Sequence, residues 1–446
     1  MNTFLKGSLL LIVAAFISEC LEFLINMVLA RELGEEGLGL YMAILPTIVF
    51  LVVIASMELP ISISKAIAEK DRVYHRSFLQ HTVRFTGAFT VAFFLIAVIV
   101  FPLLPVFDKY HPLLKWLLLL LVPIISFSSV ARGYFMGSQH MGKIAIANFL
   151  RRAVQLVLLI AVFQLFHFDS EVAILISICT LIATELVVFL YLFIQFIAVM
   201  KGLRRQTSKQ VKQTSALHAL LSVSLPTTGL RIFHAASFAV KPFLIKFALM
   251  RAGMGEELAV IQYGKLAGVA FTIGFFPAFI AHSLLIILIP TVSEAYANKD
   301  LTKLKRLMQK VMVFTLVYAV PAATVFYFFS DDLTSLFFED SPAAVYLQLL
   351  VPYFFFHFFV IPMQAFLIGL GLVKDAFLHS VWSTSLSFLL MIVLGSMPQL
   401  QMDGIIIGMN TGVVLLTLMH YVTIRDKMQQ PLSWKFSSNR PTFFNK

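Results

Sequence analysis

The sequence predicts an all-α polytopic membrane protein with about twelve transmembrane helices in two six-helix lobes. Composition, the length of the apolar segments and an internal repeat support this prediction. Of the 446 residues, 59% are hydrophobic and only 13% are charged, and the mean hydropathy is +0.90. Such a chain has too little polar surface to cover a water-soluble globule of this size. It must be solvated by the lipid bilayer, and we expect a multi-pass protein of the plasma membrane.

Apolar segments long enough to span a bilayer recur along the whole chain. A hydrocarbon core of about 30 Å requires roughly 20 helical residues. Such segments lie at 8–30, 38–63, 86–107, 113–135, 145–167, 172–199, 218–250, 266–291, 311–329, 344–370, 376–397 and 404–423. None alternates apolar and polar residues over its length, which favours helices over a β-barrel.

The connections between these segments alternate between basic and acidic. Lysine and arginine gather at 65–84, 201–212, 299–310 and 425–446, whereas the intervening connections carry the acidic residues. By the positive-inside rule, both termini are predicted to be cytoplasmic. We therefore expect an N-terminal lobe (1–200), a basic cytoplasmic linker (201–216), a C-terminal lobe (217–424) and a cytoplasmic tail (425–446). The net charge of +11 is explained by this pattern, so no nucleic-acid partner is expected.

An internal repeat relates the two halves. Ser64-Lys-Ala-Ile-Ala-Glu-Lys-Asp71, after the second span, matches Ser293-Glu-Ala-Tyr-Ala-Asn-Lys-Asp300, after the eighth, at five of eight positions. A weaker echo pairs Tyr134-Phe-Met-Gly137 with Phe366-Leu-Ile-Gly369. Six spans per half give both halves the same orientation, so a pseudo-two-fold axis along the membrane normal is expected.

Three short motifs are similar to those of a known family. They are Leu33-Gly-Glu-Glu-Gly-Leu-Gly-Leu-Tyr41, Ile289-Pro-Thr-Val-Ser-Glu-Ala-Tyr-Ala-Asn-Lys-Asp300 and Gly133-Tyr-Phe-Met-Gly137. The chain resembles the polysaccharide-flippase branch of the multidrug/oligosaccharidyl-lipid/polysaccharide exporter superfamily, in particular its sporulation members. The resemblance implies two six-helix lobes around a central cavity, alternating access, and an undecaprenyl-pyrophosphate-linked saccharide as cargo for the spore envelope. Lipid II flippases of this family have fourteen spans, so the twelve counted here argue against lipid II itself.

Ionisable residues at membrane depth are costly, which makes each one a candidate functional residue. Glu19, Glu22 and Asn26 lie on one face of the first span at i, i+3 and i+7, and we predict that they couple transport to an ion. Two adjacent carboxyl groups suit a shared proton or cation.

The seventh span carries cations where the first carries carboxylates. Arg231, His234 and Lys241 lie within an arc of roughly 80° and are predicted to bind phosphate oxygens of the substrate. Pro226, Gly229 and Pro242 interrupt this span and are predicted to form a hinge. The competing interpretation is a network of ion pairs that only neutralises buried charge, which we favour for Lys246.

Other charged residues are weaker candidates. Arg132 is a further predicted substrate ligand, whereas Arg84, Arg151 and Arg152 near cytoplasmic helix ends are expected to reach lipid phosphates. We expect Glu58 and Glu185 each to pair with such an arginine. His282, His357 and His379 lack a second ligand at i+3 or i+4, which argues against a metal site. The aromatic run 353–359 is expected to face lipid or pack.

The sequence contains no P-loop, HExxH or GxSxG motif, so we predict no enzyme activity and no cofactor. Na⁺ and H⁺ are the candidate coupling ions. The leading prediction is a flippase for a lipid-linked saccharide or related anionic envelope precursor such as a peptidoglycan precursor. The alternatives are a multidrug or metabolite cation antiporter of the same superfamily and a non-transporting membrane scaffold that recruits envelope-synthesis proteins.

Overall fold

The computed structural model describes residues 3–204, 209–338 and 343–429, and it contains only helices and their connections within these ranges. Twelve helices of the described chain are long and apolar enough to cross a membrane. The all-α prediction with twelve spans is therefore confirmed.

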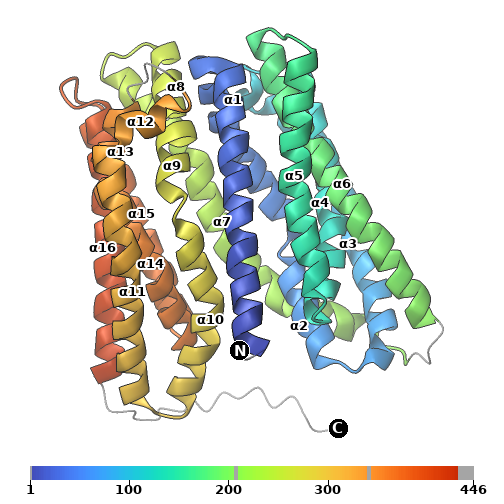
Figure 1. Cartoon of the computed structure of the whole chain (residues 1–446). Coiled ribbons are helices and arrows are strands. Elements are labelled where there is room, and N and C mark those ends of the chain that lie inside the picture. The colour runs from blue at the N-terminus through green and yellow to red at the C-terminus, as the bar shows by residue number, and fades with distance from the viewer. Residues whose placement is uncertain (1–2, 205–208, 339–342, 430–446) are drawn as a thin grey trace.

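The N-terminal lobe consists of the helices α1 to α6, on the right of Figure 1. Their bounds are α1 (Thr3–Ser56), α2 (Leu59–Glu69), α3 (Arg72–Val100), α4 (Leu113–Gly137), α5 (Met141–Leu165) and α6 (Ser170–Arg204), with the short turns η1 (Phe101–Leu103) and η2 (Pro105–Phe107) between α3 and α4.

One sharp turn makes two spans out of α1. Gly34 has φ 67° and ψ −176°, far from helical values, and glycine alone adopts this conformation without strain. The predicted spans 8–30 and 38–63 thus follow each other without a loop, as two arms on either side of Gly34, except that the second arm ends at Ser56 and residues 59–63 belong to α2. The first arm rises from the N-terminus and the second returns (Figure 1). We call the two ends of the molecule the Gly34 end and the Thr3 end.

The C-terminal lobe contains the remaining helices. They are α7 (Gln213–Arg251), α8 (Glu256–Gly264), the π-helix η3 (Lys265–Ala270), α9 (Phe271–Phe275), α10 (Ala278–Ala297), α11 (Leu301–Phe328), α12 (Ser330–Ser335), α13 (Ala343–Leu349), α14 (Val351–Gly369), α15 (Val373–Gly395) and α16 (Met402–Gln429). α8 to α10 follow one another down the molecule in Figure 1, so the predicted span 266–291 is one crossing that begins in a π-helix and is interrupted at Phe276 and Pro277. The last helix ends at the Thr3 end, where α1 begins.

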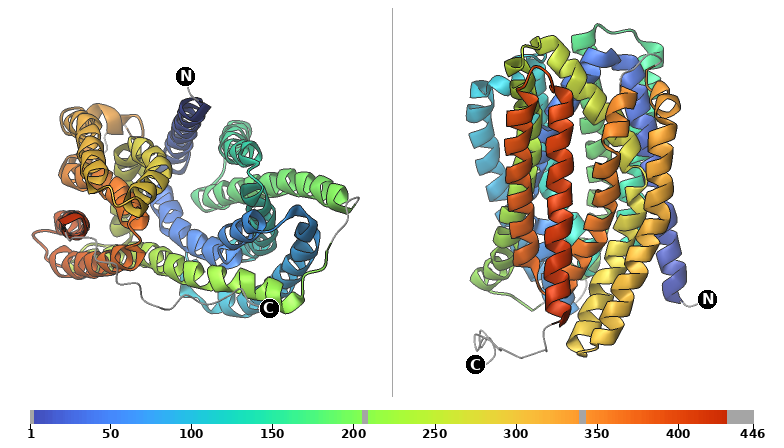
Figure 2. Two further views of the ribbon diagram at one scale, coloured as in Figure 1. Left: turned by 90° about the horizontal axis from the view of Figure 1, so that it is seen from below. Right: turned by 90° about the vertical axis from the view of Figure 1, so that its left-hand side faces the viewer.

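The two lobes meet along α1 and α7. The first arm of α1 lies between the lobes, and α1 packs on α7, α8, η3 and α10. Seen from below in Figure 2, α7 runs from beneath the N-terminal lobe, where it contacts α2 and α3, to α15 in the C-terminal lobe. α7 therefore belongs to both sides of the interface.

The internal repeat reappears as the same contact in both lobes. In the N-terminal lobe, a Cβ on Gly137 would overlap Ser64 and Ile67; in the C-terminal lobe, a Cβ on Gly369 would overlap Val292. Ser293 Oγ also donates a hydrogen bond to the Gly369 carbonyl oxygen at 3.1 Å. The two sequence echoes thus mark the close approach of α2 to α4 and of α10 to α14.

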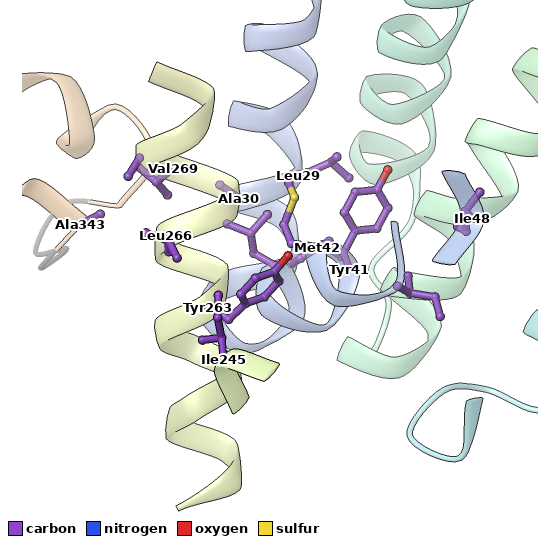
Figure 3. Close-up of a cluster of buried hydrophobic side chains, with 14 of the residues drawn as sticks. Leu29, Ala30, Tyr41, Met42, Ile48, Ile245, Tyr263, Leu266, Val269 and Ala343 are labelled. Atoms are coloured by element: carbon purple, nitrogen blue, oxygen red, sulfur yellow. The ribbon is translucent and has the colours of Figure 1, made fainter. Parts of the chain in front are cut away.

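Buried apolar side chains connect the lobes near the Gly34 end. Figure 3 shows Leu29, Tyr41 and Met42 of α1 beside Ile245 of α7 and Tyr263 of α8. A lipid-exposed surface gains little from apolar burial, so helices in membranes associate through close packing of small residues. Gly39 serves this purpose, because a Cβ there would overlap the Val260 carbonyl oxygen of α8.

Candidate functional site

A cavity of about 380 Å³ lies between the lobes, and both lobes contribute charged residues to it. Both arms of α1 line it, with α5, α7 and the segment from α8 to α9. Its polar and charged lining residues are Glu19, Glu22, Asn26, Arg152, Lys241, Tyr263 and Thr272. Aromatic side chains from α1, α7 and α9 form much of the remaining wall.

The predicted carboxylate face of the first span opens onto this cavity. Glu19, Glu22 and Asn26 all line it, in agreement with their helical spacing. Arg152 of α5 forms an ion pair with Glu22. The expectation that Arg152 reaches lipid phosphates is therefore wrong: an arginine from inside the N-terminal lobe neutralises one of the two carboxylates and leaves Glu19 without an ion pair in the described chain.

The three predicted cations of α7 occupy different places. Lys241 lines the cavity between the lobes and also a second cavity, inside the C-terminal lobe, which His234 lines as well. Arg231 instead pairs with Glu58 at the start of α2, with 2.9 Å between Arg231 Nη1 and Glu58 Oε1. Ten residues separate Arg231 from Lys241, which corresponds to about 15 Å along a helix. Arg231 and Lys241 therefore lie at different sites, although they lie on the same face of α7.

The second cavity has a volume of about 230 Å³ and a wall rich in hydroxyl groups. Its polar lining residues are His234, Ser237, Lys241, Tyr353, His357, Ser383, Thr384 and Ser387. Lys241 forms no ion pair among the described residues, so this cation is free to meet an anion. Tyr353 and His357 come from the aromatic run that we expected to pack or face lipid, and their rings stack with centroids 5.8 Å apart.

Arg132 lies outside both cavities. Its Nη1 donates a hydrogen bond to Asn148 Oδ1 of α5 at 2.9 Å, while its buried Nη2 has no hydrogen-bond partner among the residues that the structure describes. Three residues after Asn148 in α5, Arg151 forms an ion pair in which its Nε lies 2.9 Å from Glu185 Oε1 of α6. The expected pairing of Glu185 with an arginine is thus confirmed, whereas Glu58 pairs with Arg231 rather than with one of the arginines near the cytoplasmic helix ends.

The predicted hinge residues lie in an unbroken helix. α7 runs from Gln213 to Arg251, and Pro226, Gly229 and Pro242 all lie within it. The Pro226 side chain lies outside the described residues, and a Cβ on Gly229 would meet no atom of the described residues within 4 Å. Their role as a hinge stays a prediction.

A second group of charges joins the lobes at the Gly34 end. Lys265 Nζ of η3 lies 2.9 Å from Glu35 Oε1 of α1, and the lysine side chain is only 7% exposed. Glu256 Oε1 pairs with Lys109 at 2.7 Å and with Lys246 at 2.8 Å. Lys246 is therefore part of an ion-pair network, as favoured from the sequence.

The histidines do not assemble a metal site in the ranges that the structure covers. No group of three or more His, Cys, Asp or Glu residues there has metal-binding geometry. His379 is nevertheless not isolated, because its Nδ1 lies 3.0 Å from Nδ1 of His420 in a buried pair between α15 and α16.

The chain has the same fold as several solved structures that are described as transporters. The chain is similar to an inward-facing multidrug resistance MATE family transporter of the MOP superfamily, with a TM-score of 0.73, 15% identity and coverage of 92% of this chain and 94% of that one. An outward-facing structure of such a transporter gives 0.65, 17% and 95% of each chain. A MOP superfamily transporter from Pyrococcus furiosus, described as having a binding pocket of reverse polarity, gives 0.62, 16% and 95% of each.

The chain thus shares the two-lobed fold of MOP superfamily transporters. The chain belongs to the polysaccharide biosynthesis protein family, whose model matches residues 4–256, and the MatE model matches residues 260–386. It is 54% identical to sporulation protein YkvU of Bacillus subtilis (strain 168) over 95% of both chains. It is 33% identical to stage V sporulation protein B of the same organism, over 99% of this chain and 87% of that one. The resemblance inferred from the short motifs is confirmed.

Proposed function

We propose that this protein is a flippase that moves a lipid-linked saccharide, or a related anionic envelope precursor, across the plasma membrane by alternating access. Its family and its sporulation relatives support a role in making the spore envelope. The basic connections support cytoplasmic termini. The transporter-type fold also supports a protein without catalytic activity of its own.

Lys241 is the observation that carries this proposal. It lines both cavities and has no ion-pair partner among the described residues, so a substrate anion is the natural partner for its charge. The hydroxyl groups of Ser237, Ser383 and Ser387 beside it donate hydrogen bonds within their own helices, and their oxygens can accept hydrogen bonds from sugar hydroxyls. A cation next to hydroxyl groups suits a phosphate-linked saccharide better than it suits a cationic drug.

The carboxylates of α1 supply the means of coupling. Glu19 and Glu22 line the same cavity as Lys241, and Arg152 holds only Glu22. A proton or Na⁺ bound at Glu19 would change the charge facing Lys241 and so link ion binding to substrate binding. Asn26 can add a neutral oxygen ligand on the same helical face.

A liposome assay tests the proposal. Purified protein is reconstituted, and movement of a labelled undecaprenyl-linked saccharide is followed by its accessibility to an external reagent. We expect Lys241→Gln to reduce movement at least tenfold, because one charged hydrogen bond to phosphate is worth about 1.5–3 kcal/mol. Lys246→Gln is the matched control, since Lys246 lies on the same helix but is paired with Glu256. Equal activity of both variants would refute the substrate site.

A cation antiporter is the second candidate, favoured by the unpaired Glu19 in the cavity of the described chain. It predicts exchange of ethidium against Na⁺ or H⁺ that is lost in Glu19→Gln and unaffected by Lys241→Gln. Absence of both activities in folded protein would favour the scaffold that recruits envelope-synthesis proteins.

A further inference from the structure

A groove on the outer surface of the C-terminal lobe lies apart from the transport cavities. It runs between α11 and α16 at the Thr3 end, where the two helices lie side by side in Figures 1 and 2. Its volume is about 500 Å³, and Met308, Met312, Ile424 and Met428 provide an apolar floor. Methionine side chains adapt readily to a flexible apolar ligand.

Two cations border this groove. Lys305 of α11 and Arg425 of α16 both line it, and neither forms an ion pair or hydrogen bond in the part of the chain that the structure describes. Basic side chains nearby are engaged: Lys303 lies 3.3 Å from Glu294, and Lys427 lies over the Tyr296 ring. Lys305 and Arg425 are therefore available to bind an anion from outside the protein.

An exposed apolar strip leads from these cations toward the centre of the bilayer. On α11 it includes Val313 and Val317, which are 61% and 66% exposed, and Leu418 and Val422 extend it on α16. Val313 lies about 12 Å and Val317 about 18 Å from the level of Lys305 along a helix. Half a hydrocarbon core is about 15 Å, so the strip matches one leaflet.

We propose that this groove binds one anionic phospholipid of the leaflet at the Thr3 end. The phosphate lies between Lys305 and Arg425, where the guanidinium can donate two hydrogen bonds and the ammonium supplies a point charge. Gln309 and Tyr421 line the groove one turn deeper and can donate to the headgroup or ester oxygens. One acyl chain lies along the methionines toward Val313.

Quenching by brominated lipid tests the proposal at the site itself. Val313→Trp provides a reporter in a background in which Trp116, Trp382 and Trp434 are replaced by phenylalanine. The full-length protein is reconstituted in mixtures of brominated phosphatidylglycerol and unbrominated phosphatidylcholine. We expect phosphatidylglycerol to bind beside this groove reporter roughly three- to tenfold more tightly than phosphatidylcholine, as two interfacial cations permit. A control reporter, Val91→Trp on α3, replaces a valine that is 60% exposed and should give equal binding of both lipids.

Charge-neutral variants distinguish specific lipid binding in the groove from non-specific attraction by the surface charge of the protein. The double variant Lys305→Gln, Arg425→Gln should remove the lipid preference at the groove reporter, whereas Lys310→Gln, which removes a cation of the same helix outside the groove, should retain it. The proposal would be overturned if the preference for phosphatidylglycerol persisted in the double variant. It would also be overturned if Lys310→Gln abolished this preference as well, or if the control reporter showed the same preference.

Discussion

The two ends of the interface between the lobes are held together differently. At the Gly34 end, α1 approaches α8 so closely that Gly39 leaves no room for a Cβ, and the buried Lys265 crosses from one lobe to Glu35 of the other. Toward the Thr3 end, the contact depends on α7 reaching under α2, where Arg231, 59% exposed, pairs with Glu58. The Gly34 end is held together by the close packing of α1 on α8. The Thr3 end is held together by α7, which contacts helices of both lobes.

This difference indicates which end must change most in the proposed cycle. A transporter that opens toward the Gly34 end has to separate Gly39 from Val260 and Lys265 from Glu35 together, because both contacts join the same two segments. The carbonyl oxygen of Leu336 also accepts two hydrogen bonds from Arg31 there, at 3.0 and 3.2 Å.

Gly39→Ala should have the largest effect. The added Cβ overlaps the Val260 carbonyl oxygen, which belongs to the backbone and cannot rotate away. We expect a loss of about 1–3 kcal/mol in the closed conformation and a loss of transport in the liposome assay. Gly142→Ala is the control, since a Cβ at Gly142 meets no atom of the described chain within 4 Å. Wild-type thermal stability and transport in Gly39→Ala would show that the ends do not differ as described.

Glu35→Gln should have the next largest effect. It leaves the buried Lys265 ammonium without its partner, and breaking such a pair costs up to about 3 kcal/mol when one partner stays partly exposed. The Gly34 end should open more often, which can be measured as at least tenfold faster thiol labelling of Val260→Cys in protein lacking Cys20 and Cys179. The exchange Glu35→Lys with Lys265→Glu should restore slow labelling. Unchanged labelling in Glu35→Gln would mean that the pair does not hold this end closed.

The sequence predicts those features of this interface that depend on one helix at a time. Glu19, Glu22 and Asn26 line the cavity as expected because helical spacing alone sets their common face. The close approach at Gly137 and Gly369 was already marked by the repeat, because both lobes use the same local pattern.

Features that depend on how two helices are rotated against each other were not predictable. Arg152 forms an ion pair with Glu22, and Arg231 forms one with Glu58. Each pair joins two helices, so the residue spacing within one helix does not predict it. Tyr353 and His357 were missed for another reason. Their i, i+4 spacing was a usable signal, but it was hidden in a run of phenylalanines.

The two variants of the pair at the Thr3 end should differ in their cost to stability. Arg231→Gln leaves the Glu58 carboxylate, 5% exposed, without its partner, whereas Glu58→Gln leaves an arginine that is already largely exposed. We expect Arg231→Gln to cost about 1–2 kcal/mol and Glu58→Gln less than half of that. Melting temperatures of the two purified variants check the order. If Glu58→Gln is the more damaging variant, Arg231 has a role beyond this pair.

The smallest effect is expected at Glu256, which has two lysine partners. Lys109 reaches it from the N-terminal lobe and Lys246 from its own lobe, and both are partly exposed. Because an exposed pair contributes about 0.2–1 kcal/mol, Lys109→Gln should change thiol labelling of Val260→Cys no more than about fivefold. Lys246→Gln removes a partner within one lobe and should leave the labelling rate unchanged. A tenfold rise for Lys109→Gln would show that this surface pair, rather than the buried Lys265 and the glycine contact, closes the Gly34 end.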